Sequence, residues 1–313
     1  MLLLATLGVA GLHWLTNRYD RTVTKEQLLD ASARQKRTDL SGPLNYLLIG
    51  SDHRPGANPE DQRSDSILIV HVPAGLRQAY LISVPRDLLV AIPAAPGFGG
   101  GQDKVNAAYE HGGGGQAGAR LLSATLTRLT GVRFDGAALV DFSGFKQVID
   151  LLGGIRMCVD TPVRSIHTKT LFDAGCQQMN GARTLDYVRQ RYGLPDGDYD
   201  RQRHQQQMLR AVLDKAGETH LRSDPVKLDR VLRAVGGALT LDSNGVPLED
   251  LLLALRGLPA DALHGVQVPS YPQTIDQVSY VVLDNGGGGL FDALRGKRMP
   301  EWAGDHPRWV NRL

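Results

Sequence analysis

Three short apolar runs with charged residues at their ends constrain the fold of this chain most strongly. The runs, each of a length suited to a buried strand, are Leu44–Gly50, Ser66–Val72 and Ala79–Val84. The charged residues beside them are Asp52, Arg63, Asp65, Arg86 and Asp87. Continuous apolar runs are typical of strands buried on both faces of an α/β sheet, and ligand sites commonly lie at the polar ends of such strands. The sequence therefore predicts an α/β fold with a site at one edge of its sheet.

Helical patterns alternate with strand patterns along the rest of the chain. Apolar periodicity predicts helices at residues 116–129, 142–152, 182–186, 200–216, 226–239 and 248–258. Two further strands, at 265–268 and 279–283, are expected to complete the sheet. The chain has 313 residues, 42% of them hydrophobic, which suffices for one large core.

The segment 187–207 is dense in arginine. Arg189 and Arg191 lie two apart in a segment predicted to be a strand, which would place both side chains on one face. Arg201 and Gln205 share one face of the helix expected to follow. Guanidinium groups stay charged at physiological pH and match the geometry of phosphate oxygens. The segment thus predicts a site for a multiply charged anion, and a solvated charged turn is the alternative.

Two aspartates flank the polar loop between the first two predicted strands. Asp52 follows the first strand and Asp65 precedes the second, so the two carboxylates could meet as a seat for Mg²⁺. Magnesium uses few protein carboxylates and completes its shell with water and substrate phosphates. An Asx turn or a helix cap is the alternative for either residue alone.

Other kinds of site find little support in the sequence. The chain has no Gly-x-Ser-x-Gly elbow, no His-Glu-x-x-His helix and no Gly-x-x-x-x-Gly-Lys-Ser/Thr loop. The formal net charge is only +2, and aromatic residues make up 6% of the chain. Because the basic residues gather at the predicted anion site and form no broad stripe, we expect no nucleic-acid partner.

The charged groups stand in an order that one family shares. Six groups of residues carry the match: Asn45–Asp52; Arg63–Asp65; Ser83–Asp87; Lys104–Tyr109; Val140–Phe142 with Ile149–Gly154; and Tyr187–Arg191, followed by Asp198 and Arg201. Over residues 45–215 the chain resembles the LytR-CpsA-Psr cell-envelope proteins of actinobacterial type. One departure is His204, which stands where many relatives carry an arginine before two glutamines. We expect this histidine on the surface of its helix.

The resemblance implies an enzyme that takes an anionic glycopolymer from a polyprenyl-pyrophosphate carrier and attaches it to peptidoglycan. The new link would be a phosphodiester bond, and Mg²⁺ would be the cofactor. The implied magnesium ligands are Asp52 and Asp65. The implied pyrophosphate ligands are Arg63, Arg86, Arg189, Arg191, Arg201 and Gln205. The implied catalytic set is Asp52, Asp65, Arg63, Arg86, Asp87 and Asp198. Such a set suits phosphoryl transfer, which asks a protein mainly for positioning and neutralisation of charge.

The identity of a general base and the exact activity stay open at this point. Asp87 or Asp198 could orient the acceptor hydroxyl or take its proton. Alternatively, Asp87 orients Arg86 or Arg63, and Asp198 caps the following helix. A polyprenyl-pyrophosphate hydrolase and a non-catalytic, regulatory protein that holds the lipid pyrophosphate are the rival functions.

The two cysteines, Cys158 and Cys176, are an even number in a chain that resembles extracytoplasmic proteins. A disulfide between them is therefore expected, and two buried free thiols are the alternative. No Cys-x-x-Cys pair occurs, which argues against a thiol catalyst or a metal site at these residues.

The resemblance also implies a membrane location and a division of the chain. Residues 1–16 are largely apolar but shorter than the roughly 20 residues of a full span, so we expect a short, truncated anchor or else a buried helix. A linker at 17–41, a catalytic domain at 42–288 and a C-terminal tail at 289–313 would follow. The enzyme would be a single-pass protein of the cell membrane, with its catalytic domain outside the cytoplasm.

The expected architecture is a three-layer α/β/α sandwich with a central mixed sheet. The resemblance further implies an apolar tunnel for the prenyl chain. Its expected walls are two apolar stripes, at Phe142, Phe145 and Val148 and at Met208, Leu209 and Val212. Such stripes are also typical of an ordinary core.

Overall fold

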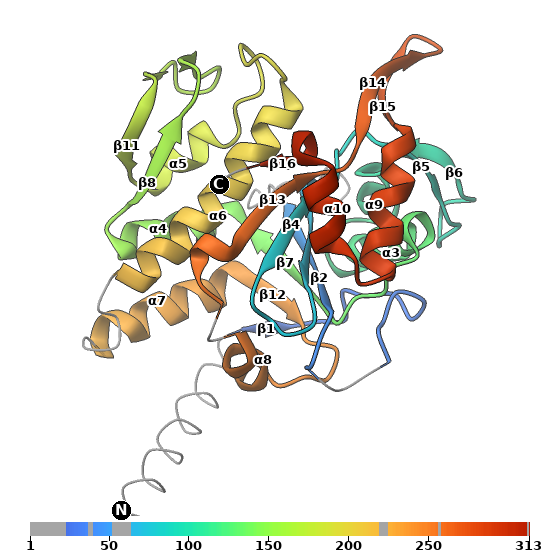
Figure 1. The fold of residues 1–313 in the computed structure, drawn as a ribbon, viewed down its shortest axis with the longest axis horizontal. Helices are drawn as coiled ribbons and strands as arrows, with labels where there is room; N and C mark the ends of the chain where they lie inside the picture. The colour runs from blue at the N-terminus through green and yellow to red at the C-terminus, as the bar shows by residue number, and fades with distance from the viewer. Residues whose placement is uncertain (1–22, 37–39, 52–63, 219–224, 256–257, 312) are drawn as a thin grey trace, which may run out of the picture.

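The computed structural model describes residues 23–36, 40–51, 64–218, 225–255, 258–311 and 313 (Figure 1). Its described part is built on one eight-stranded sheet. In spatial order the strands are β1 (Thr24–Lys25), β12 (Leu239–Asp242), β7 (Gly136–Asp141), β2 (Leu44–Ser51), β3 (Ser64–Val72), β4 (Ala79–Ser83), β13 (Leu263–Gln267) and β16 (Val310–Asn311). The three apolar runs of the sequence form β2, β3 and β4 in its middle. Because β2 is parallel to β7 but antiparallel to β3, and β4 is parallel to β13, the predicted mixed sheet is confirmed.

Helices cover both faces of this sheet (Figure 1). One side carries α2 (Ala107–His111), α3 (Gly115–Thr130), α9 (Asn285–Arg295) and α10 (Met299–Asp305). The other side carries α4 (Phe142–Leu152), α5 (Gly181–Tyr187), α6 (Asp198–Glu218), α7 (Pro225–Ala238) and α8 (Leu248–Leu255). Because side chains alternate along each strand, the sheet contributes apolar residues to a core on each of its two faces. Ile49 packs into the core of the first side, whereas Leu68 and Leu81 pack with Leu209 of α6 on the second. The three-layer α/β/α sandwich is therefore confirmed.

Small two-stranded sheets and single turns complete the described fold. The pairs are β5 (Leu89–Ile92) with β6 (Gly101–Lys104), β8 (Ile155–Val159) with β11 (Gly175–Met179), β9 (Val163–Arg164) with β10 (Leu171–Phe172), and β14 (Ser270–Ile275) with β15 (Val278–Leu283). Short 3₁₀ turns lie at Ala260–Ala262 and Pro307–Trp309. The expected disulfide is present: Cys158 of β8 is bonded to Cys176, its partner in the register of β11.

Two predictions about strands are wrong. The segment 279–283 does not complete the main sheet, because β15 pairs with β14 in a hairpin that projects from the molecule (Figure 1). Arg189 and Arg191 do not lie in a strand but in the turn after α5. That helix, capped by the Asn180 side chain, extends to Tyr187, and its hydrogen bonding continues from Val188 N to Thr184 O. The helical turn thus reaches Val188, one residue before Arg189, where the spacing of the arginines suggested a strand.

The ends of the described chain contribute to the core. Leu28 and Leu29, within the segment predicted as a linker, are 0% and 2% exposed and pack in the first core. In the predicted C-terminal tail, Trp302 is 6% exposed and packs in the same core. The predicted anchor at 1–16 lies outside the described residues. Within the described ranges, none of the helices combines the length and the apolar character needed to cross a membrane.

The two stripes predicted as tunnel walls take part in core packing where they are described. Val148 of α4 is 3% exposed and packs with Val231 of α7. Met208 of α6 is 5% exposed and packs with Ile149 and Tyr187. The tunnel itself stays a prediction.

Candidate functional site

A pocket of about 230 Å³ gathers most of the predicted site residues. Six of the site residues predicted from the sequence line it: Asp65, Arg86, Arg189, Arg191, Arg201 and Gln205. They come from the start of β3, the chain after β4, the turn after α5 and the first turns of α6. The predicted convergence of two elements on one site is therefore seen, although one element is a turn where a strand was expected. Asp52 and Arg63, two further predicted residues, lie outside the described part of the chain.

Ion pairs lock the inner wall of this pocket. Arg86 Nη1 lies 2.5 Å from Asp65 Oδ1. Arg201 Nη2 lies 2.7 Å from Asp198 Oδ1 and donates a hydrogen bond of 3.0 Å to the backbone oxygen of Asp65. Arg86 Nε lies 4.0 Å from the same Asp198 oxygen. Two arginines and two aspartates thus form one connected network at the strand ends.

Burial affects the pKa values of the two inner arginines, Arg86 and Arg201, to different extents. Burial is the strongest influence on Arg201, which is 5% exposed, and together with repulsion from Arg86 it holds the pKa of this guanidinium below its ordinary value despite Asp198. Burial also lowers the pKa of Arg86, but the negative charges of Asp65, Asp87 and Asp198 outweigh it, so that this pKa is raised. Arg201 therefore carries a positive charge that the protein compensates poorly, and a bound anion would stabilise it.

Two hydrogen-bond donors of this wall have no hydrogen-bond partner among the described residues. Nε of Arg86 and Nε of Arg201 are buried and form no hydrogen bond with any described residue. Buried donors are normally satisfied, and leaving one without a partner costs about 1–3 kcal/mol. Because both Nε atoms are buried, an anion with several oxygens would accept from the other nitrogens of the two guanidinium groups.

The outer wall of the pocket presents two more arginines. Arg189 and Arg191 follow α5, and Arg191 Nη2 donates a hydrogen bond of 2.9 Å to Tyr192 Oη. The guanidinium carbon of Arg191 lies 4.7 Å from the centre of the Tyr192 ring, which is an arrangement for a cation–π contact. Tyr192 itself is 54% exposed and forms part of the rim.

The sequence did not predict one loop that contributes to the pocket. Ile166 and His167 also line the pocket. Hydrogen bonds fix this loop to α5 and the turn after it: Ser165 Oγ donates to Asp186 at 2.6 Å, and Ile166 N donates to Gln190 Oε1 at 3.2 Å. These polar residues lie far apart in the sequence. Their hydrogen bonds, and with them the position of the loop at the pocket, are therefore visible only in the structure.

Asp87 and Asp198, the candidate bases, both form ion pairs with basic side chains. Asp87 lies 2.9 Å from Lys104 Nζ and 3.6 Å from Arg86 Nε. Asp198 begins α6, where it pairs with Arg201 and accepts a hydrogen bond of 3.0 Å from Gln202. Both arrangements suit carboxylates that position cationic side chains.

Gln205 enters the pocket from α6 with its amide oxygen already fixed. Ser66 Oγ donates to Gln205 Oε1 at 2.9 Å, which joins the helix to β3 next to Asp65. Ser66 was not predicted as a site residue, although it lies beside Asp65 in the sequence.

The strand ends offer oxygen ligands of the kind that Mg²⁺ prefers. The hydroxyl of Ser64 is buried without a hydrogen-bond partner among the described residues, and it immediately precedes Asp65. Ser51, which precedes Asp52, is paired with Ser64 in the strand register. Within the described ranges, no group of three or more His, Cys, Asp or Glu side chains is arranged to bind a metal. The described donors fit a magnesium ion only as part of a set that also needs substrate oxygens or Asp52.

The expectation that His204 lies on the surface is wrong. Its side chain is 2% exposed, stacks on Tyr187 with ring centres 4.4 Å apart, and lies with Nε2 3.0 Å from Tyr187 Oη. Burial, reinforced by Arg203, lowers its pKa to about 4. A neutral, enclosed imidazole of this kind supports the packing of α5 against α6.

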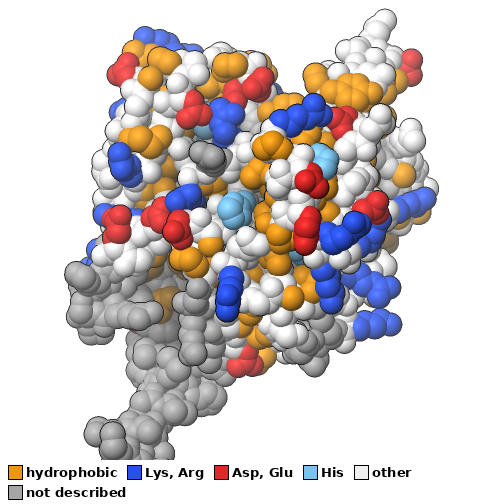
Figure 2. All heavy atoms as spheres, viewed as in Figure 1, with side chains coloured by type: hydrophobic (Ala, Val, Ile, Leu, Met, Phe, Trp, Pro, Cys, Tyr) orange, Lys and Arg blue, Asp and Glu red, His pale blue; other side chains and the backbone are white. Residues whose placement is uncertain are grey.

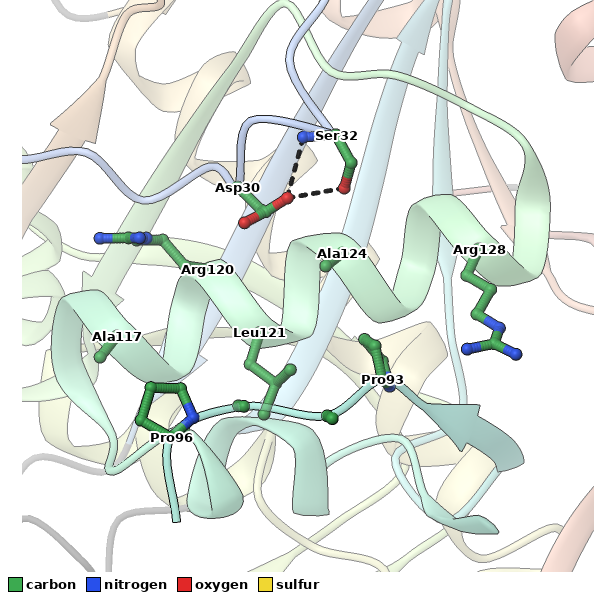
Figure 3. A pocket seen from close by; sticks show the side chains of 12 residues that line it. Asp30, Ser32, Pro93, Pro96, Ala117, Arg120, Leu121, Ala124 and Arg128 are labelled. Carbon is green, nitrogen blue, oxygen red and sulfur yellow. Dashed lines mark hydrogen bonds between the residues drawn. The ribbon is translucent and has the colours of Figure 1, made fainter. Parts of the chain in front are cut away.

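A larger pocket, of about 530 Å³, lies along α3 and contains none of the predicted residues (Figure 3). Asp30 and Ser32 lie on one side of the helix and Pro93 and Pro96 on the other. Asp30 accepts hydrogen bonds from Ser32 N at 2.8 Å and from Ser32 Oγ at 2.6 Å, so its carboxylate is engaged in a local turn. The charged network of the smaller pocket is therefore the better candidate for chemistry.

Known proteins share both the sequence pattern and the fold. Residues 14–287 match the LytR_cpsA_psr family. The chain is 32% identical over 248 residues to a probable cell wall biosynthesis protein, LcpB, of Corynebacterium glutamicum, covering 75% of this chain and 57% of the relative. It is 28% identical over 220 residues to the polyisoprenyl-teichoic acid–peptidoglycan teichoic acid transferase TagU of Enterococcus faecalis, covering 69% of this chain and 67% of the relative.

Solved structures support the same grouping at the level of the fold. A LytR-Csp2A-Psr enzyme from Actinomyces oris superposes with a TM-score of 0.64 at 24% identity, covering 87% of this chain and 95% of that one. TagT bound to LIIa-WTA superposes with a TM-score of 0.65 at 23% identity, covering 86% and 98%. The chain spans about half the length of the LcpB and LcpA proteins that it matches. With a family match over most of its length, the chain belongs to the LytR-CpsA-Psr family.

Proposed function

We propose that this protein is an extracytoplasmic phosphotransferase that moves an anionic cell-wall glycopolymer from a polyprenyl-pyrophosphate carrier to peptidoglycan. The observation that carries the proposal is the convergence of four arginines, Arg86, Arg189, Arg191 and Arg201, on one pocket. A pyrophosphate supplies the several oxygens that such a pocket needs. The relatives named for teichoic acid transfer and cell wall biosynthesis support this choice of substrate class.

The reaction is a transfer between two oxygens. A hydroxyl of the peptidoglycan acceptor attacks the phosphorus that bears the glycopolymer, and a phosphodiester bond forms. The bridging P–O bond of the pyrophosphate breaks, polyprenyl phosphate leaves, and the hydroxyl proton passes to solvent or to a nearby oxygen. Charge spreads over the phosphoryl oxygens during this step, so fixed cationic donors lower its barrier.

The arginines would supply that stabilisation from prearranged positions. Arg201 and Arg86 would bind the inner oxygens, while Arg189 and Arg191 would bind those nearer the rim. Asp198 and Asp87 would hold the inner cations in place, because both carboxylates already form ion pairs with them. The oxygens of both carboxylates already face cationic side chains, which supports positioning as the role of both residues.

Magnesium would be held by Asp65 together with Asp52. The ion would neutralise part of the pyrophosphate charge when it is bound. Asp65 also pairs with Arg86, so it would connect the cation and the guanidinium network.

The proposed location follows from the chemistry of the donor. A polyprenyl chain stays in a lipid bilayer, and peptidoglycan lies outside the cytoplasm, so the enzyme would work at the outer surface of the cell membrane. The predicted single-pass anchor at residues 1–16 would keep it there.

A transfer assay with three variants tests the proposal. Purified protein is incubated with lipid-linked glycopolymer and peptidoglycan, and the covalent product is measured. Arg201→Ala and Arg201→Lys should each lower kcat/KM by about 100-fold or more, because removal of one fixed donor to transition-state charge has an effect of that size. Lysine keeps the charge but lacks the planar fork. Arg233→Ala removes an arginine of α7 that is 54% exposed, and it should leave the rate unchanged.

The same assay separates the rival functions. Release of phosphorylated glycan in the absence of peptidoglycan would identify a hydrolase. Retention of the donor without any turnover would identify a binding protein. Either result in the wild type would overturn the proposed transfer.

A further inference from the structure

A second pocket lies where the projecting hairpin meets the C-terminal helices. It has a volume of about 480 Å³ and lies at the base of β14–β15, next to the start of α9 and the 3₁₀ turn Pro307–Trp309. Six of its lining side chains are Tyr271, Asp284, Asn285, His306, Arg308 and Trp309. Figure 2 shows hydrophobic side chains gathered at the base of this hairpin, with charged side chains beside them.

The pocket presents aromatic faces framed by hydrogen-bonding groups. Tyr271 is 49% exposed. Arg308, with 72% of its side chain exposed, lies 4.7 Å from the centre of the Trp309 ring and 3.1 Å from Asp284 Oδ2. The other oxygen of Asp284 caps α9 by accepting from Gly286 N at 2.5 Å. These contacts fix Asp284, Arg308 and Trp309 relative to one another in advance of any ligand.

This combination suits a saccharide. A pyranose ring has a face of C–H groups that packs on an aromatic ring, and hydroxyls around its edge that hydrogen-bond to carboxylate, amide and guanidinium groups. The single arginine of the pocket is already paired with Asp284. The pocket is therefore poorly suited to a polyphosphate, in contrast to the arginine-rich pocket, and favours a sugar chain with few charges.

One tyrosine connects this pocket to the proposed catalytic site. Tyr199 follows Asp198 directly, and its hydroxyl lies 2.9 Å from Ser270 Oγ, next to Tyr271. Its backbone oxygen accepts a hydrogen bond of 2.7 Å from Gln267, which fixes this part of α6 to β13. Burial raises the pKa of Tyr199, the bond from Ser270 opposes this, and the charges of both Asp198 and Asp284 add to it. A carboxylate of the hairpin pocket, Asp284, and the Arg201 partner Asp198 thus act on the same phenol.

We propose that the hairpin pocket binds a glycan segment of the peptidoglycan acceptor, so that a neighbouring sugar presents its hydroxyl beside Asp198 and Arg201. The inference rests on the proposed transfer function. It assigns donor and acceptor to different pockets, which Tyr199 of α6 connects through its hydrogen bond with Ser270. Separate pockets let the enzyme hold a pyrophosphate donor and a glycan acceptor at the same time, each with side chains of matching chemistry.

Direct binding measurements on the full chain test this assignment. The probe is a soluble glycan strand of alternating N-acetylglucosamine and N-acetylmuramic acid, and polyprenyl pyrophosphate is titrated separately. Tyr271→Ala and Trp309→Ala should each raise the Kd for the glycan about tenfold, since the loss of one stacked ring is worth roughly that factor. Arg308→Ala, at an exposed position that leaves the core intact, should raise it several-fold. The Kd for polyprenyl pyrophosphate should change less than about twofold in all three.

Leu213→Ala is the matched control, because it removes a 52% exposed apolar side chain on another part of α6. In the transfer assay, the three pocket variants should raise KM for the acceptor with little change in KM for the donor. Unchanged glycan affinity in these variants, or no glycan binding by the wild type, would overturn the assignment. Glycan binding that depends on Tyr271 in a protein without transfer activity would uphold the pocket and refute the proposed function.

Discussion

At the scale of single residues, two buried histidines make the fold sensitive to acid. Burial lowers the pKa of His71 and, with help from Arg203, that of His204 to about 4, from an ordinary value of 6.5. Below pH 6.5 the unfolded chain therefore binds protons that the folded chain refuses. The free energy of unfolding falls as the pH decreases from about 6.5 toward 4, and above that window the two histidines have no such effect.

The variant His204→Gln isolates one of these contributions. Between pH 7 and pH 5 each buried histidine should lower the free energy of unfolding by about 2 kcal/mol. Asp160 and Asp200 oppose the shift of His204, and they remain in the variant. Urea unfolding at the two pH values should show that the variant loses about 2 kcal/mol less than the wild type. Equal losses would mean that His204 titrates normally in the folded state.

His204 also shows why burial was missed from the sequence. It stands among glutamines, and such polar segments usually face water. In the structure His204, Gln205 and Gln206 are all buried, because the sheet and the neighbouring helix supply hydrogen-bond partners for them. Arg86 and Arg201 do line one pocket, because ligand sites commonly form where the polar ends of strands and helices meet, but their role as pyrophosphate ligands stays a prediction.

At the scale of elements, one glutamine fastens α6 to the sheet. Gln206 Nε2 lies 2.9 Å from Leu81 O and 2.9 Å from Val266 O, on β4 and β13. Its oxygen accepts from Asn311 of β16 at 2.9 Å. Gly265 makes this approach possible, since a Cβ atom there would lie 2.2 Å from Gln206 Oε1.

Gly265→Ala should therefore destabilise the protein by about 2 kcal/mol, as overpacking in a core does. Gln206→Ala should also destabilise, by about 2–4 kcal/mol, because buried partners lose their hydrogen bonds. In the double variant the clash with Gln206 is absent and only the approach to Leu313 Cδ2, at 2.9 Å, remains, so its loss should be smaller than the two single losses combined. Urea unfolding of all four proteins gives the coupling energy. Simple additivity would show that Gly265 and Gln206 do not constrain each other.

The predictions at this scale succeeded where local pattern and packing agree. The apolar runs of β2 to β4 and the periodicity of α3 and α4 suffice to define those elements. The segment 279–283 has the same strand pattern, yet it pairs in the β14–β15 hairpin, because sequence pattern does not specify the partner of a strand. Arg189 and Arg191 were misplaced for a related reason: a spacing of two residues occurs in turns as well as in strands.

At the scale of the whole molecule, the small net charge gives no indication of the arginine-rich pocket. The net charge is only +2, while four of the arginines line one pocket of about 230 Å³. Their clustering depends on the sheet order, which brings the ends of β3 and β4 next to the start of α6. Total charge therefore says little about the ligand, and the positions of charges along the chain say more.

Magnesium binding should appear as a change in the stability of the whole fold. A ligand that binds only the folded state at ten times its Kd adds about 1.4 kcal/mol, which corresponds to roughly 3 °C in the Tm of a domain this large. If Asp65 is a ligand, MgCl₂ should raise the Tm of the wild type relative to EDTA at matched ionic strength, and Asp65→Asn should abolish that rise. Asn keeps the size of the side chain but loses the charge that holds a hard cation. Asp261→Asn, at an exposed aspartate on the Ala260–Ala262 turn, serves as the matched control and should keep the full response. An equal rise in Asp65→Asn would show that the charge of Asp65, at the start of β3, contributes nothing to binding the ion.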